Sequence, residues 1–183
     1  MTQTLDRRTI MNEAGKAGIA LGGLVVICMA IVAFMPKGNG VGGAALFTGV
    51  TAIVWLVKFL GCIWLMQFFM KKLVKDYSGV NNVDTLKLGM WSAFFSALIV
   101  AAASMAEVMF INPDSYQDAI REAINTYSVT MDSNMETTLD NIIDKMPVIS
   151  FFSNLIYCFV YGWILSLILS RRIPTFDPFA NSQ

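Results

Sequence analysis

The chain has 183 residues, 56% of them hydrophobic and 14% charged, and its formal net charge is zero. Such a composition is typical of an integral membrane protein, and the balanced charge gives no reason to expect a nucleic-acid partner. The sequence contains no histidine, which excludes the catalytic pairs and metal sites that depend on an imidazole.

Four apolar stretches are long enough to cross a bilayer. They are Ala17–Met35, Ala44–Met70, Leu88–Ile111 and Val148–Ser170. Each spans roughly 19 residues or more, and a helix that rises about 1.5 Å per residue needs about 20 to cross the hydrocarbon core. The sequence therefore predicts an all-α fold, an integral membrane four-helix bundle that forms one domain over residues 1–183.

Small residues line one face of the first stretch. Ala14, Gly18 and Gly22 lie one helical turn apart. A face of this kind lets another helix approach closely, either within the chain or between chains. Pro36 and the glycines after it predict a tight, non-helical connection, so we expect the first two helices to be antiparallel neighbours.

The second and third stretches each hold a charged residue. Lys58 lies near the centre of the second, and Glu107 lies about one turn from the outer end of the third. Charges within the hydrocarbon are costly and usually face protein or water. Ser92 and Ser96 belong to a small, polar face of the third helix that suits close packing. Residues 77–84 predict a break between the two helices.

Residues 112–147 predict two amphipathic helices that form an extracytoplasmic hairpin or lie across the bundle. The first stripe is Tyr116, Ile120, Ile124 and Tyr127, and the second is Met135, Leu139, Ile142, Ile143 and Met146. Ser133 and Glu136 have capping-box spacing at the start of the second helix, and Pro147 is expected to end it. The acidic face of the segment favours either a sensing or docking surface or a solvated cap.

The fourth stretch places Asn154 at a depth comparable to that of Glu107, with Tyr157 and Tyr161 on the same face. The backbones of Lys58 and Glu107 differ in depth by roughly 9 Å, a gap that the lysine stem can partly close. Hydrogen bonds from Asn154 and a tyrosine hydroxyl to Glu107 need a smaller shift in depth than an ion pair between Lys58 and Glu107. Two interpretations stay open: a proton, ion or substrate site, or polar groups that hold the helices together or line a wet crevice.

Positive charge differs between the connections. The N-terminal tail, the second connection and the C-terminal tail are rich in Lys and Arg, whereas the first connection has only Lys37 and residues 112–147 are acidic. Because connections in the cytoplasm carry the excess of Lys and Arg, the sequence predicts a multi-pass protein with both termini in the cytoplasm. Residues 112–147 then lie outside it.

Several short motifs carry a resemblance to a known family. They are Leu86-Lys87-Leu88-Gly89, the run Ser92–Ile99, Asn112-Pro113-Asp114 and the acidic stretch before the last helix. With these motifs the chain resembles a bacterial family catalogued as domain of unknown function forty-one ninety-nine. The usual Gly-x-x-Ser/Thr-Phe-Gly-Glu lead-in is replaced here by residues 82–86. The resemblance implies a four-helix inner-membrane protein and supplies no activity and no functional residues.

We expect a non-enzymatic membrane protein, without catalytic residues, cofactor or metal site, that assembles with itself or with another membrane protein in the lipid bilayer. The alternative is a small transporter or channel component that uses Lys58 and Glu107. Four helices without an inverted repeat are few for a carrier, which would then need to oligomerise. A membrane enzyme ranks third, because the sequence has no histidine and no paired catalytic carboxylates in its apolar stretches.

Overall fold

The computed structural model describes residues 6–35, 41–77, 79–111, 122 and 133–173, and the elements in these ranges are helices. They are α1 (Arg7–Ala33), α2 (Val41–Asp76), α3 (Asn82–Ala106), the π-helical segment η1 (Glu107–Ile111) and α5 (Ser133–Arg172). In this part of the chain, four helices are long and apolar enough to cross a membrane. The prediction of four helices long and apolar enough to span a membrane is confirmed, and it indicates a multi-pass membrane protein.

The helices extend beyond the apolar stretches that predict them. α1 begins at Arg7 rather than Ala17, and α2 continues past Met70 to Asp76. Hydropathy identifies only the apolar part of a helix that can lie in the hydrocarbon core. The backbone hydrogen bonds of the helix continue beyond it into charged residues. The predicted break between the second and third helices is confirmed, and Gly79 there has a φ of 86°, which favours glycine.

The expectation that Pro147 ends a helix is wrong. α5 passes through Pro147 without interruption. A proline removes one backbone donor, and membrane helices tolerate this where neighbouring groups satisfy the freed carbonyl. The second half of the predicted hairpin is therefore continuous with the last spanning helix. The first amphipathic stripe, Tyr116 to Tyr127, lies outside the described residues.

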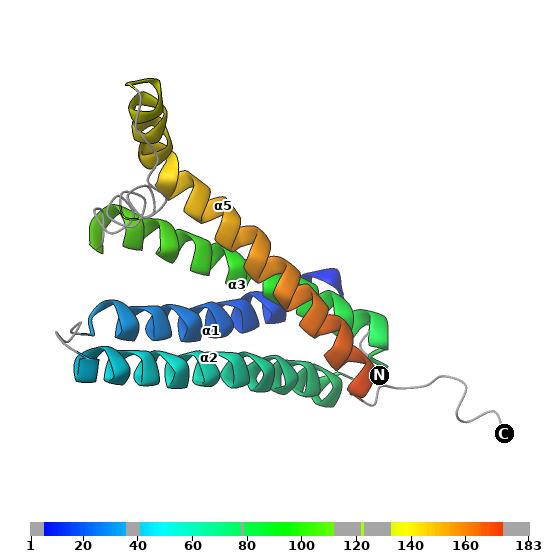
Figure 1. Cartoon of the computed structure of the whole chain (residues 1–183). Helices are drawn as coiled ribbons and strands as arrows, with labels where there is room; N and C mark the ends of the chain where they lie inside the picture. Colours follow the sequence, from blue (N-terminus) through cyan, green and yellow to red (C-terminus); the bar gives the residue numbers. More distant parts are fainter. Residues whose placement is uncertain (1–5, 36–40, 78, 112–121, 123–132, 174–183) are drawn as a thin grey trace.

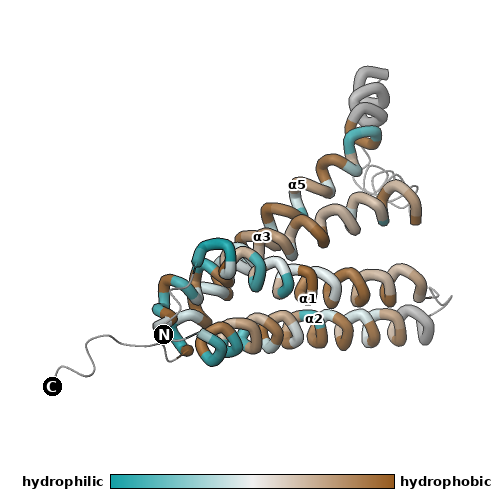
Figure 2. Tube along the Cα trace, turned by 180° about the vertical axis from the view of Figure 1, so that it is seen from behind, coloured by the Kyte–Doolittle hydropathy of each residue, from teal (hydrophilic) through white to brown (hydrophobic). Residues whose placement is uncertain are grey.

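The helices form two uneven layers. α1 and α2 lie side by side, as predicted for the first pair, and α3 packs between α1 and α5 (Figure 1). α5 crosses α3 and has little contact with α2. Seen from behind, α5 again diverges from the pair of α1 and α2, with hydrophilic residues gathered near the opposite end of the bundle (Figure 2). The bundle is thus closed at one end and opens between α2 and α5 toward the other.

Glycines set the close approach of α3 to its two neighbours. A Cβ on Gly18 of α1 would lie 2.5 Å from the Cβ of Phe95, and one on Gly162 of α5 would lie 2.6 Å from the Cβ of Ala93. Both separations are shorter than van der Waals contact, so the helices could not pack this closely with a larger residue at either position. The small-residue face of the first helix serves contact within the chain.

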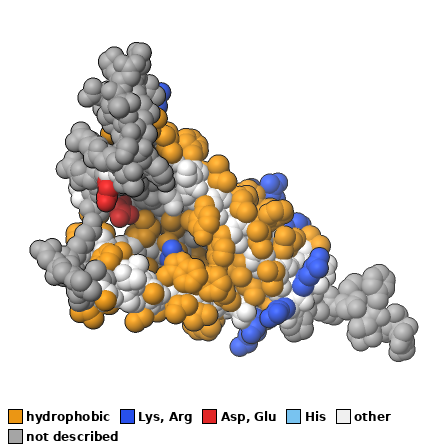
Figure 3. Space-filling model, viewed as in Figure 1, with side chains coloured by type: hydrophobic (Ala, Val, Ile, Leu, Met, Phe, Trp, Pro, Cys, Tyr) orange, Lys and Arg blue, Asp and Glu red, His pale blue; other side chains and the backbone are white. Residues whose placement is uncertain are grey.

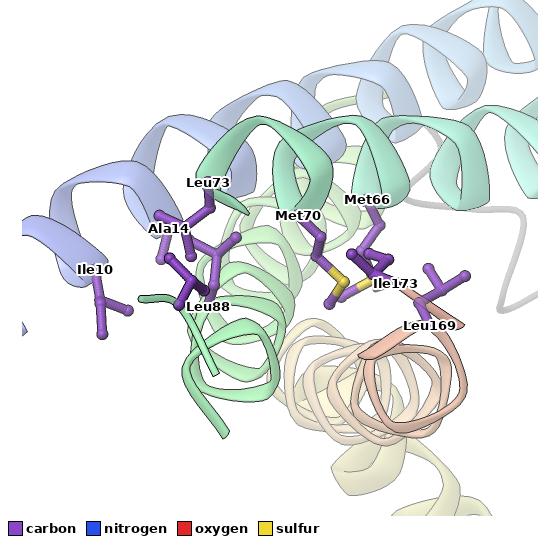
Figure 4. Close-up of a cluster of buried hydrophobic side chains, with 9 residues drawn as sticks. Ile10, Ala14, Met66, Met70, Leu73, Leu88, Leu169 and Ile173 are labelled. Carbon is purple, nitrogen blue, oxygen red and sulfur yellow. The ribbon is translucent and has the colours of Figure 1, made fainter. Parts of the chain in front are cut away.

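A buried apolar cluster joins all four helices at the closed end (Figure 4). Its members are Ile10, Ala14, Met66, Met70, Leu73, Val80, Leu88, Leu169 and Ile173. The start of α1, the end of α2, the start of α3 and the end of α5 meet here. Side chains of Lys and Arg gather around the same end of the molecule (Figure 3).

Candidate functional site

A cavity of about 140 Å³ lies among the four helices, where α2 and α5 diverge. Its lining side chains are mostly apolar, and none is acidic. Polar or ionisable groups come from Lys58, Ser96, Tyr157, Tyr161 and two cysteine thiols, Cys62 and Cys158. The space-filling view shows a basic side chain inside a hollow that hydrophobic side chains surround (Figure 3). We call this space the first cavity.

Lys58 extends from the middle of α2 and is half-buried. Besides the first cavity, it lines a second cavity of about 190 Å³ with side chains of α1, α2 and η1. The lysine and its neighbour Trp55 belong to both linings. Lys58 therefore lies at the boundary between the two spaces.

Glu107 lines the second cavity together with Lys58 and Thr51. It is the first residue of η1, where the backbone changes from α-helix to π-helix. Short π segments are uncommon and often accompany functional sites. The two charges face one space, but no ion pair within 4 Å joins them in the described part of the chain, where ion pairs link Lys16 with Glu13 and Lys87 with Asp84.

Aromatic side chains bridge the opening between α2 and α5 beside Lys58. Trp55 stacks on Phe59 with ring centroids 5.7 Å apart, and Phe59 approaches Tyr161 of α5 at 6.0 Å. The Tyr161 hydroxyl is buried and has no hydrogen-bond partner among the described residues. A buried hydroxyl without a partner is unusual because its desolvation is uncompensated. Tyr157, one turn earlier in α5, is exposed.

Asn154 does not join Glu107 as expected. Its Nδ2 donates to the Oγ of Ser104 and to the carbonyl oxygen of Ser150, each at 2.9 Å, and the two serine hydroxyls are also 2.9 Å apart. The Asn154 amide pairs with serines because Ser150 lies one turn before it in α5 and Ser104 faces it from α3. This network fits the interpretation of polar groups that hold two helices together.

The predicted packing residues lie on both sides of the contact between α1 and α3. A Cβ on Gly22 would meet the Ile99 side chain, and one on Gly18 would approach the backbone of Ser92 and Ser96. The Ser92 hydroxyl is buried and donates to the Leu88 carbonyl at 2.7 Å. Ser96 also lines the first cavity, so the face of α3 that packs against α1 contributes to the candidate site as well.

Sequence reasoning singled out Lys58, Tyr157 and Tyr161 and did not predict that they share a cavity. It missed the contribution of Cys62 and Cys158 to the lining. Periodicity along one helix shows which residues share a face but carries no information on which faces of different helices meet. Within the described ranges, no group of three acidic or cysteine side chains could hold a metal ion.

Three comparisons with known proteins bear on the chain. A family model described as a protein of unknown function, DUF4199, matches residues 16–171. Searches of curated proteins and of solved structures found no similar protein. The match runs from Lys16 in α1 to Arg171 in α5 and includes the candidate site.

Proposed function

We propose a function for this chain on the premise that it belongs to the DUF4199 family of proteins of unknown function. It is a non-enzymatic, multi-pass protein of the bacterial inner membrane that assembles with itself or with another membrane protein. A second copy is the first partner to test, because most oligomers are symmetric assemblies of one chain. The absence of histidine from the sequence supports a non-enzymatic role.

The observation that supports this proposal is the exposed surface of α2 and α5 on the side where these two helices diverge. Between Ala45 and Leu65, no residue of α2 is buried. α5 presents a shallow apolar groove of about 630 Å³ on the same side, lined by residues such as Ile156, Val160 and Ile164. A further helix placed here would gain van der Waals contacts with both α2 and α5. The small face at Gly18 is already used by α3, so assembly must use another face.

Cysteine crosslinking in native membranes tests this interface. In a background without Cys28, Cys62 and Cys158, we expect single cysteines replacing Leu60 on α2 or Val160 on α5 to form dimers with a short bifunctional maleimide. Ile27→Cys on the exposed face of α1 is the matched control and should remain monomeric. Dimers from all three positions at equal yield would indicate random collision, and monomers from all three would exclude a second copy on this side.

A small transporter or channel component is the second candidate, favoured because Lys58 and Glu107 line one cavity. In this case Lys58→Leu and Glu107→Gln should keep the fold and abolish the phenotype that the intact gene restores to a deletion strain. Lys71→Leu, an exposed substitution on the same helix, is the control. Full complementation by both neutral variants would rule out a charged pathway.

We also propose that both termini are cytoplasmic. The described beginning of α1 and end of α5 lie at the same end of the bundle. The basic residues at the ends of α2 and α5, Lys75, Arg171 and Arg172, lie there as well. The positive-inside rule assigns this end to the cytoplasm.

A further inference from the structure

We propose that the first cavity binds the ionised head of a long-chain carboxylic acid at Lys58, with the single apolar chain of the ligand along α5. The site is built from residues of one chain and requires no second copy, although the apolar chain of the ligand would lie in the same α5 groove that the assembly proposal gives to a further helix. The proposal therefore goes beyond assembly and does not depend on it.

The charge of Lys58 is the first reason. An ammonium group inside a membrane protein is usually paired with an anion or exposed to water. No acidic side chain lines the first cavity, and Glu107 lies across the second cavity, beyond ion-pair distance among the described residues. The first cavity thus offers a cation without an anion, in apolar surroundings that strengthen an ion pair.

The hydrogen-bonding groups are the second reason. The Tyr161 hydroxyl lines the same cavity and is buried without a partner among the described residues. The Lys58 ammonium can only donate, and a hydroxyl can donate to a charged acceptor. A carboxylate has two oxygen atoms and can accept from both groups, whereas a neutral alcohol cannot neutralise the lysine.

The shape of the site is the third reason. A cavity of about 140 Å³ has room for about ten water-sized groups, since one ordered water needs roughly 10–15 Å³. Tyr157 and Tyr161 line both this cavity and the open groove of α5, so the two spaces adjoin. Ile156, Val160 and Ile164 in the groove offer an apolar path for one chain.

Quenching of tryptophan fluorescence by a brominated fatty acid tests the proposal. Trp55 lines the first cavity, so we expect saturable quenching in the purified full chain that Trp55→Phe removes. Lys58→Met should raise the dissociation constant at least tenfold, whereas Lys71→Met should leave it unchanged. The methyl ester of the same brominated acid should show no saturable phase, because it lacks the charge.

Three results would overturn the proposal: equal saturable binding of acid and ester, unchanged affinity of Lys58→Met, or tighter lysine-dependent binding of a brominated two-chain phospholipid. If Lys58→Met does not fold, Tyr161→Phe replaces it, because it removes one hydroxyl and should weaken acid binding several-fold. Tyr77→Phe, which removes a tyrosine hydroxyl that does not line the cavity, is its matched control and should leave acid binding unchanged. A monomeric protein that binds the acid would contradict the proposed assembly and leave this site intact.

Discussion

At the scale of single residues, Lys58 is a charged side chain at the centre of a candidate membrane-spanning helix. A lysine at the centre of a spanning helix costs about 2.5–3.5 kcal/mol on scales derived from insertion. Lys58 is half-buried between two cavities, where water or a ligand can solvate the ammonium group. The ammonium group can therefore be accommodated without a side-chain partner. Replacing Lys58 shows whether the charge mainly lowers stability or is needed for function.

We expect Lys58→Leu to keep or raise the thermal midpoint of the purified protein. The free energy of unfolding should rise by up to about 3 kcal/mol. Lys58→Glu should lower it, because a second carboxylate would then face Glu107 across the second cavity. Thermal unfolding in detergent, followed by circular dichroism, measures both, with Lys71→Leu as the control. Equal destabilisation by both variants would mean that the lysine stem is needed for packing.

The network at Asn154 gives a second prediction at this scale. Asn154→Leu removes the hydrogen bonds to Ser104 and Ser150. Interhelical hydrogen bonds in membrane proteins contribute about 0.6 kcal/mol on average and up to about 1.7, so a loss within this range is expected. Ser153→Leu, at an exposed neighbouring position, should change little. Unfolding in a denaturing detergent measures both variants, and equal losses would contradict a specific role for the network.

At the scale of helices, close packing of α1 on α3 depends on one glycine face. A Cβ on Gly18 would lie 2.5 Å from the Phe95 Cβ and 3.1 Å from the Ser92 carbonyl oxygen, whereas one on Gly15 would meet nothing within 4 Å. Overpacking costs about 1–3 kcal/mol, while alanine favours a helix over glycine by roughly 0.5–1 kcal/mol. Gly18→Ala should therefore destabilise the protein.

Gly15→Ala is the matched control on the same helix and should be neutral or stabilising. The free energy of unfolding in a denaturing detergent compares the two variants. A Gly18→Ala variant as stable as Gly15→Ala would mean that α1 and α3 can separate at no cost. The contact at Gly18 would then contribute little to the fold.

Pro147 gives the second prediction at the scale of helices. Because α5 continues through it, Pro147→Ala restores one backbone donor to an uninterrupted helix and should stabilise it by up to about 3 kcal/mol. Val148→Ala restores no donor and is the control. Hydrogen exchange should show protected amides on both sides, from Asp144 to Ser150. Fast exchange before Pro147 with protection after it would mean that the helix ends there.

The sequence predicts the existence of the helices well because each must satisfy its own backbone in hydrocarbon. It predicts their ends poorly: Arg7 and Ser133 begin helices well before the apolar residues that reveal them. Capping-box spacing did point to Ser133, where α5 begins, whereas the rule that a proline ends a helix failed at Pro147. Local rules thus found one helix start, at Ser133, and missed the start at Arg7 and the continuation through Pro147.

At the scale of the whole molecule, the sequence predicts that α1 and α2 are neighbours but does not predict which helices α3 and α5 contact. The sequence relates Lys58 and Glu107 by depth alone, and the structure adds that both line a cavity beside α1. The glycines at 18 and 22 suggested a close contact, but only the fold shows that α3 is the partner. Each helix has several faces through which it could pack. Which helices pair therefore depends on the packing of all four helices together.

The last prediction concerns the orientation of this bundle. Both ends of the described chain lie at the closed, basic end, and residues 112–132 connect helices at the opposite end. In a cysteine-free background, an impermeant maleimide added to intact cells should label Ser133→Cys and not Ser78→Cys, because the proposed topology places only the former outside the cytoplasm. Permeabilised cells should label both, which controls for reactivity. Labelling of Ser78→Cys but not Ser133→Cys in intact cells would reverse the topology and place the open end of the site toward the cytoplasm.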